Sequence, residues 1–248
     1  MFRPKRCRRD FFDRHHLDVA EDLLFCHLGW DGVSGRIVET EAYALEGDPA
    51  CHTATRPSTR EFVRRYPPGT VYAYINYGMY WLLNVLAGDG IILIRAMEPL
   101  KGIETMQQRR RKSRLSDLCS GPGKLGQAIN LGATDHGTSL MTKERHLVLC
   151  EESIDVCHWL RQCFPVNSTD IDRGTQAHPV VMQHSLTDNA PGCNTALPRD
   201  AEPSCRIVRD VRVGISSGLD LHWRFLIADN PHVSVPAGKA LSKSRAVK

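Results

Sequence analysis

The chain has 248 residues, enough for one large domain or two small ones, and its 42% hydrophobic and 24% charged residues are typical of globular proteins. The 32 basic and 28 acidic side chains give a formal net charge of +4, which is too small to identify a binding partner by itself. No apolar run reaches the roughly 18 residues that a transmembrane helix requires, so we expect no membrane partner.

The cysteine pattern argues against a disulfide-stabilised secreted protein. The nine cysteines include no CxxC pair, and their odd number leaves at least one thiol free. The first nine residues are basic but lack the apolar stretch of a secretory signal. We therefore expect an intracellular protein in a reducing compartment.

The positive charge is concentrated in a few clusters. Segment 151–205 contains eight acidic and three basic residues, so the remainder of the chain carries a net charge of +9. The clusters lie in the N-terminal residues, at Arg56, Arg60, Arg64 and Arg65, and in the run Arg109–Arg114. Such clusters are typical of proteins that bind phosphate backbones, although a solvated helix face is an equally good interpretation.

Hydrophobic periodicity and turn residues predict an α+β fold with a mixed or antiparallel sheet. The expected elements, in chain order, are an amphipathic helix over Asp10–Leu28, strands over Gly35–Tyr43 and Val71–Tyr77, a hairpin turn at Gly88-Asp89-Gly90, a strand over Ile91–Ala96, a helix over Leu100–Arg114, a helix beginning near Lys124, and strands over Arg206–Ile215 and Trp223–Ala228.

The domain organisation follows from the same patterns. Residues 1–16 form a basic N-terminal arm, residues 17–235 form the folded domain, and residues 236–248 form a C-terminal tail. Between about 155 and 205, polar residues, proline and glycine dominate and the apolar periodicity fades. We expect this segment to be a flexible insert, because it can bury little apolar area to offset the entropy of ordering.

Three charged side chains could form a buried ionic site. Glu39 and Glu41 are two residues apart on a predicted strand, so both face the same side, although a solvent-facing stripe is the commoner explanation of such a pair. Arg95 ends an apolar strand and, if buried, needs a carboxylate partner. Either Glu41 or Glu98 could supply it.

Aromatic side chains gather between residues 72 and 81. Tyr72 and Tyr74 project from one face of their strand, and the break at Gly78 could hold Tyr77 at an exposed tip. Aromatic side chains next to basic residues can stack unpaired bases, but an aromatic core would give the same pattern. Asn84, in an apolar run, needs a polar partner that is either structural or part of a ligand.

Neither a phosphate-binding loop nor a metal site is indicated. Gly121-Pro122-Gly123-Lys124 lacks the glycine spacing and the Ser or Thr of a phosphate loop. Four possible ligands, Cys150, Cys157, His158 and Cys163, match no standard zinc-finger spacing. We expect no metal and no cofactor, and a zinc-dependent protein is the alternative that a metal analysis would test.

Several ordered motifs together resemble the alkyladenine (3-methyladenine) DNA glycosylase family. The similarity covers about residues 17–150 and 206–235. The motifs are the segment from Arg36 to Tyr43, Asp48-Pro49-Ala50 with His52, the segment from Pro68 to Tyr74, Tyr77-Gly78-Met79-Tyr80 with Asn84, the segment from Leu93 to Pro99, Ser120 to Leu125, Arg212 to Ile215, and Trp223-Arg224-Phe225.

The resemblance implies a single α+β domain with a curved, mostly antiparallel sheet, surrounding helices and a protruding β-hairpin that inserts into DNA. It implies a monofunctional enzyme that flips and hydrolytically excises alkylated or deaminated purines, such as 3-methyladenine, 7-methylguanine, hypoxanthine and ethenoadenine, in base excision repair. The implied partner is damaged double-stranded DNA, bound by a monomer in the bacterial cytoplasm or nucleoid or in a eukaryotic nucleus. A noncatalytic nucleic-acid-binding module that retains the base pocket is the alternative.

The resemblance also assigns roles to residues. Glu41 is expected to be the general base that activates water, and Arg95 to orient that water and the carboxylate. The expected base pocket consists of Tyr43, His52, Tyr74 and Asn84, where His52 hydrogen-bonds the base and Asn84 discriminates against the amino group of guanine. Tyr77 is the expected wedge, placed with the help of Met79 and Tyr80. Contacts to the DNA backbone are expected from Arg56, Arg60, Arg109, Arg110, Arg111 and Lys124.

Overall fold

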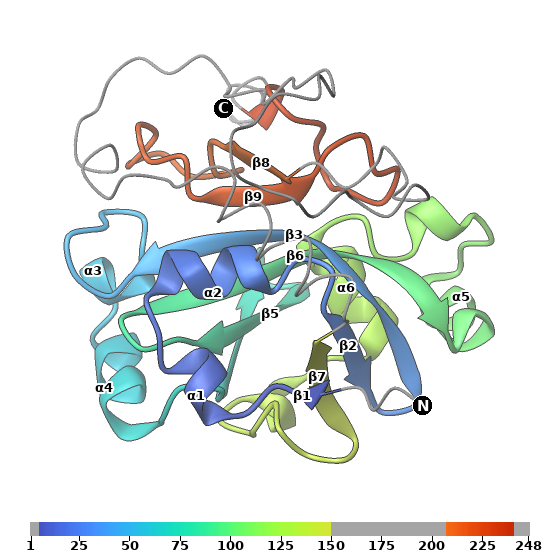
Figure 1. The fold of residues 1–248 in the computed structure, drawn as a ribbon. Coiled ribbons are helices and arrows are strands. Elements are labelled where there is room, and N and C mark those ends of the chain that lie inside the picture. The colour runs from blue at the N-terminus through green and yellow to red at the C-terminus, as the bar shows by residue number, and fades with distance from the viewer. Residues whose placement is uncertain (1–4, 150–206, 241–248) are drawn as a thin grey trace, which may run out of the picture.

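The computed structural model describes residues 5–149 and 207–240 (Figure 1). The helices are α1 (Arg9–Phe12), α2 (His16–Asp22), α3 (His52–Thr55), α4 (Pro57–Arg65), α5 (Ile103–Arg110) and α6 (Pro122–Ile129), with single 3-10 turns at Leu115–Asp117 and Ala133–Asp135. The strands are β1 (Lys5–Arg6), β2 (His27–Trp30), β3 (Val33–Ala44), β4 (Val71–Asn76), β5 (Tyr80–Leu86), β6 (Gly90–Lys101), β7 (Arg145–Leu149), β8 (Ile207–Asp210) and β9 (Arg224–Ile227).

The nine strands form one curved sheet in which every ladder between them is antiparallel. The main order is β1-β7-β2-β3-β6-β5-β4. Outside this order, β9 pairs with β3, and β8 pairs with β9. Helices lie around this sheet, and the C-terminal strands β8 and β9 lie above β3 in the view of Figure 1. The predicted α+β class with an antiparallel sheet is therefore confirmed.

Strand β3 is the centre of the sheet. One edge pairs with β6 along most of its length, whereas the other edge pairs first with β2 and then, from Glu39 to Glu41, with β9. The register shifts on both sides of Glu39, as a β-bulge requires. One strand therefore carries contacts to the N-terminal, central and C-terminal parts of the chain.

The two faces of the sheet differ in character. One face packs into the main hydrophobic core, which includes Ala42, Val71, Ala73, Leu83, Val85, Ile92, Ile94 and Phe225. The opposite face, next to α3 and α4, carries a smaller cluster in which Cys51, Phe62, Tyr72, Leu86 and Ile91 are buried. Since side chains alternate along a strand, the residues between the core positions are presented on this second face.

The single helix predicted over Asp10–Leu28 is wrong. Two short helices, α1 and α2, replace it, because His15 has an extended backbone with ψ 133° that interrupts the helix. The chain then enters β2, which pairs with β3 across a two-residue turn at Asp31-Gly32. Both turn residues have positive φ, 43° and 88°, as a tight hairpin turn needs. This Asp-Gly turn is the sequence signal that the helix prediction overlooked.

The helix predicted over Leu100–Arg114 is shorter than expected. Leu100 and Lys101 continue β6, and Gly102, with φ 74°, turns the chain into α5. Arg111 has a left-handed backbone, φ 52°, which ends the helix. The strand predicted over Arg206–Ile215 is also shorter, since β8 ends at Asp210, and the strand predicted over Ile91–Ala96 is longer, since β6 continues to Lys101. The other predicted elements are confirmed with small changes of boundary, including the turn at Gly88-Asp89-Gly90, where the Ala87 N–H donates to the Gly90 carbonyl at 2.8 Å.

Four predictions concern parts of the chain that lie wholly or partly outside the described residues. The polar segment at about 155–205 and the four possible zinc ligands, from Cys150 to Cys163, fall between the two described ranges. Of the basic N-terminal residues, 5–16 contribute β1 and α1, and the Phe12 side chain is fully buried. Of the predicted tail from 236 to 248, only residues 236–240 are described.

Across residues 5–149 and 207–240, the structure contains no helix with both the length and the apolar character needed to cross a membrane.

Helix α6 approaches β5 unusually closely because of a glycine. A Cβ atom at Gly126 would lie 2.1 Å from the Trp81 carbonyl oxygen, closer than any real contact. Strand β5 pairs with β6 only from Asn84 onward, so α6 packs beside the first half of the strand. The glycine therefore sets how α6 supports the β4–β5 hairpin.

We predict that Gly126→Ala destabilises the fold by about 1 kcal/mol or more, because overpacking against backbone outweighs the helix propensity that alanine gains. Gly132→Ala is the matched control, since a Cβ atom there meets nothing within 4 Å, and its effect should stay within about 0.5 kcal/mol. Chemical denaturation measures both. Equal midpoints for the two variants would contradict the close approach of α6 to β5.

Candidate active site

Residues from five strands form one row across the second face of the sheet. The register places Tyr72 opposite Asn84, Asn84 opposite Leu93, Leu93 opposite Glu41, and Glu41 opposite Arg224. Residues that pair directly across strands point to the same face. An aromatic ring, an amide, a carboxylate and a guanidinium are thus brought onto one surface by strands that are far apart in sequence.

Glu41 is fully buried, but its surroundings are polar. Its Oε2 accepts a hydrogen bond from the Tyr43 hydroxyl at 2.8 Å and lies 3.1 Å from Nη1 of Arg95. Its Oε1 accepts from the backbone N–H of Val213 at 2.6 Å. A carboxylate has about four lone-pair sites. These three contacts occupy both sites on Oε2 and one on Oε1, so one site on Oε1 can still accept a hydrogen bond.

Arg95 lies between two carboxylates. Its Nε donates to Glu39 at 2.9 Å, and its Nη1 contacts Glu41. Burial alone would lower the pKa of Arg95, but Glu41 and Glu39 together raise it well above its usual value. Of the two partners suggested by the sequence, Glu41 is confirmed, and Glu98 is wrong because it pairs with Arg36 at 2.6 Å.

Glu39 extends this ion pair into a chain of buried charges. It also accepts from Nε of Arg224 at 2.8 Å and from the backbone and hydroxyl of Ser234, and Arg224 contacts Asp210 at 2.9 Å. Burial would raise the pKa of Glu39, but Arg95 and Arg224 lower it overall. Glu39 therefore stays ionised inside the protein.

A second buried pair adjoins Glu41. Arg212 contacts both carboxylate oxygens of Asp48 and donates to the Ala42 carbonyl at 3.0 Å. Its guanidinium lies over the Tyr43 ring, 4.6 Å from the centroid. With all seven side chains ionised, the carboxylates of Asp48, Glu41, Glu39 and Asp210 outnumber the guanidiniums of Arg212, Arg95 and Arg224, and the site has one net negative charge.

The predicted aromatic pocket residues lie together beside these charges. The His52 ring meets the Tyr74 ring edge-on, with 4.4 Å between the ring centroids, and Nδ1 of His52 lies 3.0 Å from the Tyr72 hydroxyl oxygen. That hydroxyl is also 2.9 Å from the hydroxyl of Thr59. Burial, and then the charge of Arg56, lowers the pKa of His52 to about 4, so its ring is neutral near pH 7.

The two tyrosines and the asparagine of the predicted pocket are also held in place. Burial raises the pKa of Tyr74 to about 12, and burial followed by the Glu41 charge raises the pKa of Tyr43 well above its usual value. Both phenols are therefore protonated near neutral pH. Asn84 donates from Nδ2 to the carbonyls of Tyr72 and Leu82 at 3.0 and 3.3 Å, so its amide is fixed by the backbone.

Comparisons with known proteins identify the family of the chain. A family model described as methylpurine-DNA glycosylase matches residues 10–162. The chain belongs to this family. As a DNA glycosylase, it is an enzyme that hydrolyses N-glycosyl bonds, and its substrate is DNA.

Relatives of the chain from three bacteria are named "Putative 3-methyladenine DNA glycosylase". The protein of Chlorobaculum tepidum is 36% identical over 239 residues, which cover 93% of this chain and 91% of the relative. That of Prosthecochloris aestuarii is 34% identical over 244 residues, 92% and 91% of the two chains. That of Francisella tularensis subsp. tularensis is 37% identical over 204 residues, 81% of each.

In this glycosylase, the β4–β5 hairpin ends in an exposed, apolar tip. Tyr77 and Gly78 both have positive φ, 50° and 66°, and the Met79 N–H closes the turn on the Asn76 carbonyl at 3.1 Å. The Tyr77 side chain is 73% exposed and that of Met79 is 64% exposed. Tyr80, in contrast, packs against Gly123 of α6 and supports the base of the hairpin.

The six basic residues that the resemblance assigned to the DNA backbone lie in two places. Arg56 and Arg60 belong to the α3–α4 region, where Arg56 is exposed near the Tyr74 ring and Arg60 donates to the Thr53 carbonyl at 2.5 Å. The other four lie in or next to α5 and α6. Arg109 donates to the Ala128 carbonyl at 2.9 Å, and Lys124 donates to the Ser120 hydroxyl at 3.0 Å. Arg111 is exposed, whereas Arg110 donates to the carbonyls of Leu118 and Asp117 and to the side chain of Gln127. Each nitrogen of the Arg110 guanidinium therefore already donates a hydrogen bond within the protein.

One cluster in the described part of the glycosylase has metal-ligand chemistry. The ligand atoms of His15, His16 and Asp89 lie within 4.8 Å of one another. Direct contacts already join them, since the His16 N–H donates to Asp89 at 2.7 Å and Nδ1 of His16 lies 3.0 Å from the same oxygen. The cluster fastens the start of α2 to the β5–β6 turn.

The sequence analysis assigned no role to several partners of the predicted groups, namely Asp48, Asp210, Arg212, Val213, Arg224 and Ser234. A signal existed for Arg224, which interrupts the apolar segment Trp223–Ala228. The argument that a buried arginine needs a carboxylate, applied to Arg95, applies equally there. For Val213 the contact is made by backbone, which no side-chain pattern reveals.

We predict that the His52 ring titrates with a midpoint near pH 4, measured by NMR of its ring protons. Because its folded pKa lies below the ordinary value near 6.5, the stability it contributes is complete above that value and is lost as the pH falls toward 4. Arg56→Gln should move the midpoint upward, since it removes the neighbouring positive charge. A midpoint near 6.5 in the parent protein would contradict the burial of this ring.

Proposed function

We propose that the protein is a metal-free monomer that flips alkylated or deaminated purines out of duplex DNA and hydrolyses their glycosidic bond without cutting the strand. The observation that carries this proposal is the buried Glu41, held by Arg95, Tyr43 and the Val213 N–H on the same sheet face as the aromatic pocket. Family membership favours this enzyme over the noncatalytic module that the sequence left open.

Glu41 can hold one water molecule. Three of its lone-pair sites are occupied by protein donors, and the fourth, on Oε1, is available to a water that enters with the substrate. Arg95 and Tyr43 fix the carboxylate so that it need not reorganise during the reaction. The proposed step is removal of a proton from this water as its oxygen attacks the anomeric carbon of the sugar.

The charge of the site suits a cationic transition state. Departure of the base leaves a sugar with oxocarbenium character, which a nearby carboxylate stabilises. The chain of buried ion pairs that contains Glu39, Glu41 and Arg95 has one excess negative charge when fully ionised. An alkylated purine that arrives with a positive charge gains from the same field and from the faces of Tyr43 and Tyr74.

The pocket would select damaged bases by shape and hydrogen bonding. His52 is neutral and directs Nδ1 toward Tyr72, so its Nε2 is the nitrogen that can meet a base. Asn84 is held by two backbone carbonyls and would exclude the exocyclic amino group of guanine sterically, because its amide cannot move aside. Neutral lesions such as hypoxanthine would be held by the same walls.

Within the described residues, the groups that contact Glu41 include no amine, and this supports a monofunctional mechanism. Strand cleavage by a glycosylase through a Schiff base needs an amine at the sugar. The groups that contact Glu41 are the guanidinium of Arg95, the phenol of Tyr43 and the backbone N–H of Val213, and none of them is a lysine. Hydrolysis by an activated water is the step that this donor set favours.

The hairpin tip would occupy the space of the extruded nucleotide. Tyr77 has a left-handed backbone that is costly for a non-glycine residue, and such strain is common at functional sites. Its ring and that of Tyr74 could offset the few kcal/mol lost when a base is unstacked, since stacking provides about 1–3 kcal/mol per base. The exposed Arg56 and Arg111 are the best placed of the basic residues to meet phosphates.

We predict that Glu41→Gln lowers the single-turnover rate of base release by about 100-fold or more, because the general base is lost while the side chain keeps its shape. Binding to lesion-containing DNA should change only a few-fold. Glu98→Gln is the matched control, since it removes a carboxylate paired with Arg36 outside the pocket and should leave the rate unchanged. Base release by Glu41→Gln near the parent rate would refute this role.

We predict that Tyr77→Asn weakens binding to lesion-containing duplex DNA by about 5- to 100-fold, the equivalent of one lost stacking contact. Asparagine tolerates the left-handed backbone of this position, so the turn is retained. Tyr77→Phe should bind like the parent protein. Fluorescence anisotropy with damaged and undamaged duplexes provides the measurement, and an equal loss on both would contradict the wedge.

A further inference from the structure

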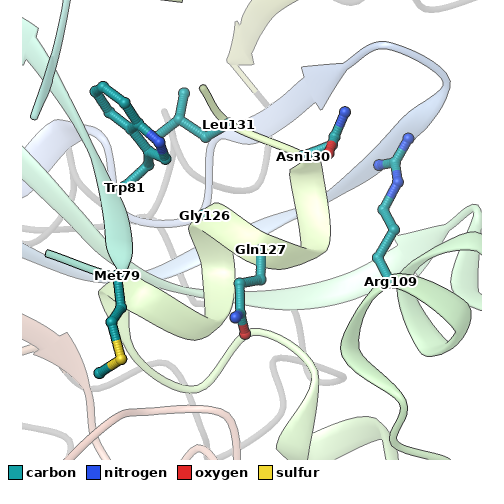
Figure 2. Close-up of a pocket in the computed structure, with 7 residues that line it drawn as sticks. All are labelled: Met79, Trp81, Arg109, Gly126, Gln127, Asn130 and Leu131. Atoms are coloured by element: carbon teal, nitrogen blue, oxygen red, sulfur yellow. The ribbon is translucent and has the colours of Figure 1, made fainter. Parts of the chain in front are cut away.

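A hollow lies beside the β4–β5 hairpin and α6, and Figure 2 shows the residues that line it. Its volume is about 270 Å³, and its lining includes Met79 and Trp81 of the hairpin, Arg109 of α5, and Gln127, Asn130 and Leu131 at the end of α6. Small-molecule pockets usually measure roughly 300–1,000 Å³. The hollow is slightly smaller than this range, so it has room for no more than one base-sized group.

The hollow and the base pocket lie on opposite faces of the same hairpin. Tyr74 pairs with Leu82, whereas Ile75 pairs with Trp81, so Trp81 points away from the face that carries Tyr74. Trp81 packs against the main core, which confirms its side of the sheet. Tyr77 lies at the exposed tip of this hairpin, in the turn that joins the two strands.

The hollow combines an apolar wall with polar groups at its rim. Trp81 and Leu131 contribute to the main core, and Met79 projects into solvent. The exposed amides of Gln127 and Asn130 each carry donors and an acceptor, which can meet the edge of any nucleobase. Arg109 adds a positive charge to the lining, with one of its N–H groups directed to the Ala128 carbonyl.

The chain that follows Arg109 of the lining is strongly basic. Arg111, Lys112 and Arg114 follow α5 directly and are exposed. In the described parts of the chain, none of the three has an ion-pair partner. Their charge is complementary to a phosphate backbone that passes the hollow.

We propose that this hollow receives the nucleotide of the complementary strand that faces the damaged base. The inference rests on the proposed function: once Tyr77 displaces the damaged nucleotide toward Tyr74, the opposing base has lost its partner. The reverse side of the hairpin is continuous with the wedge and lies next to that base. Met79 and Trp81 contact its ring, the rim amides bind its edge, and Arg109 meets its phosphate.

Gln127→Glu tests the hollow with little risk to the fold. The Gln127 side-chain oxygen accepts from Arg110, a contact that a carboxylate preserves, while the added charge repels a phosphate or a base edge. Gln108→Glu makes the same change on α5 at an exposed position outside the lining. We would measure binding of each variant to a duplex with a central lesion and to the same lesion strand alone.

We expect Gln127→Glu to weaken duplex binding by about tenfold relative to Gln108→Glu and to bind the single strand as the control does. A 2-aminopurine placed opposite the lesion should change its emission when the parent protein binds, and change less with Gln127→Glu. Equal effects of the two variants, or equal losses on duplex and single strand, would overturn the inference while leaving base release by the parent protein intact. A parent protein that releases no damaged base would overturn the proposed function and this inference together.

Discussion

The buried guanidinium of Arg95, between Glu39 and Glu41, is the interaction on which the rest of the site depends. It joins β3 to β6 and holds two carboxylates that would otherwise repel each other in the protein interior. Removing one member of such a network leaves an uncompensated buried charge, which typically costs about 3–5 kcal/mol. The orientation of Glu41, and with it the proposed activation of water, follows from this arrangement.

The network also explains why the C-terminal strands belong to the site. Asp210 and Arg224 extend the charges from Glu39, and the Val213 N–H fixes the far oxygen of Glu41. These residues follow β7 by more than fifty positions, yet β9 pairs with β3 at the level of the two glutamates. The domain is thus closed by polar contacts at its centre as well as by its hydrophobic core.

The β4–β5 hairpin separates the charged site on one of its faces from the hollow on the other. Its alternating side chains place Tyr74 on the face of the charged site and Trp81 on the face of the hollow beside α6, and the exposed Tyr77 lies at the tip. Gly126 allows α6 to approach the open edge of β5, so the hairpin is supported while its tip remains exposed. A single supersecondary element can therefore organise both strands of a duplex around one lesion, which connects the two proposals.

The sequence by itself determined local features, such as strands β3, β4 and β6, the exposed turn at Tyr77 and the shared face of Glu39 and Glu41, because alternation and turn chemistry depend on near neighbours. It did not predict β1, β2 and β7, and the roles expected of Glu41, Tyr43 and Arg95 came from the family resemblance. Only the tertiary structure decided that Glu39 rather than Glu98 shares Arg95, that Arg110 binds protein carbonyls, and that the helix expected over Asp10–Leu28 breaks at His15. Those outcomes depend on strand register and on which buried groups must be paired, and both are fixed by contacts between residues far apart in the chain.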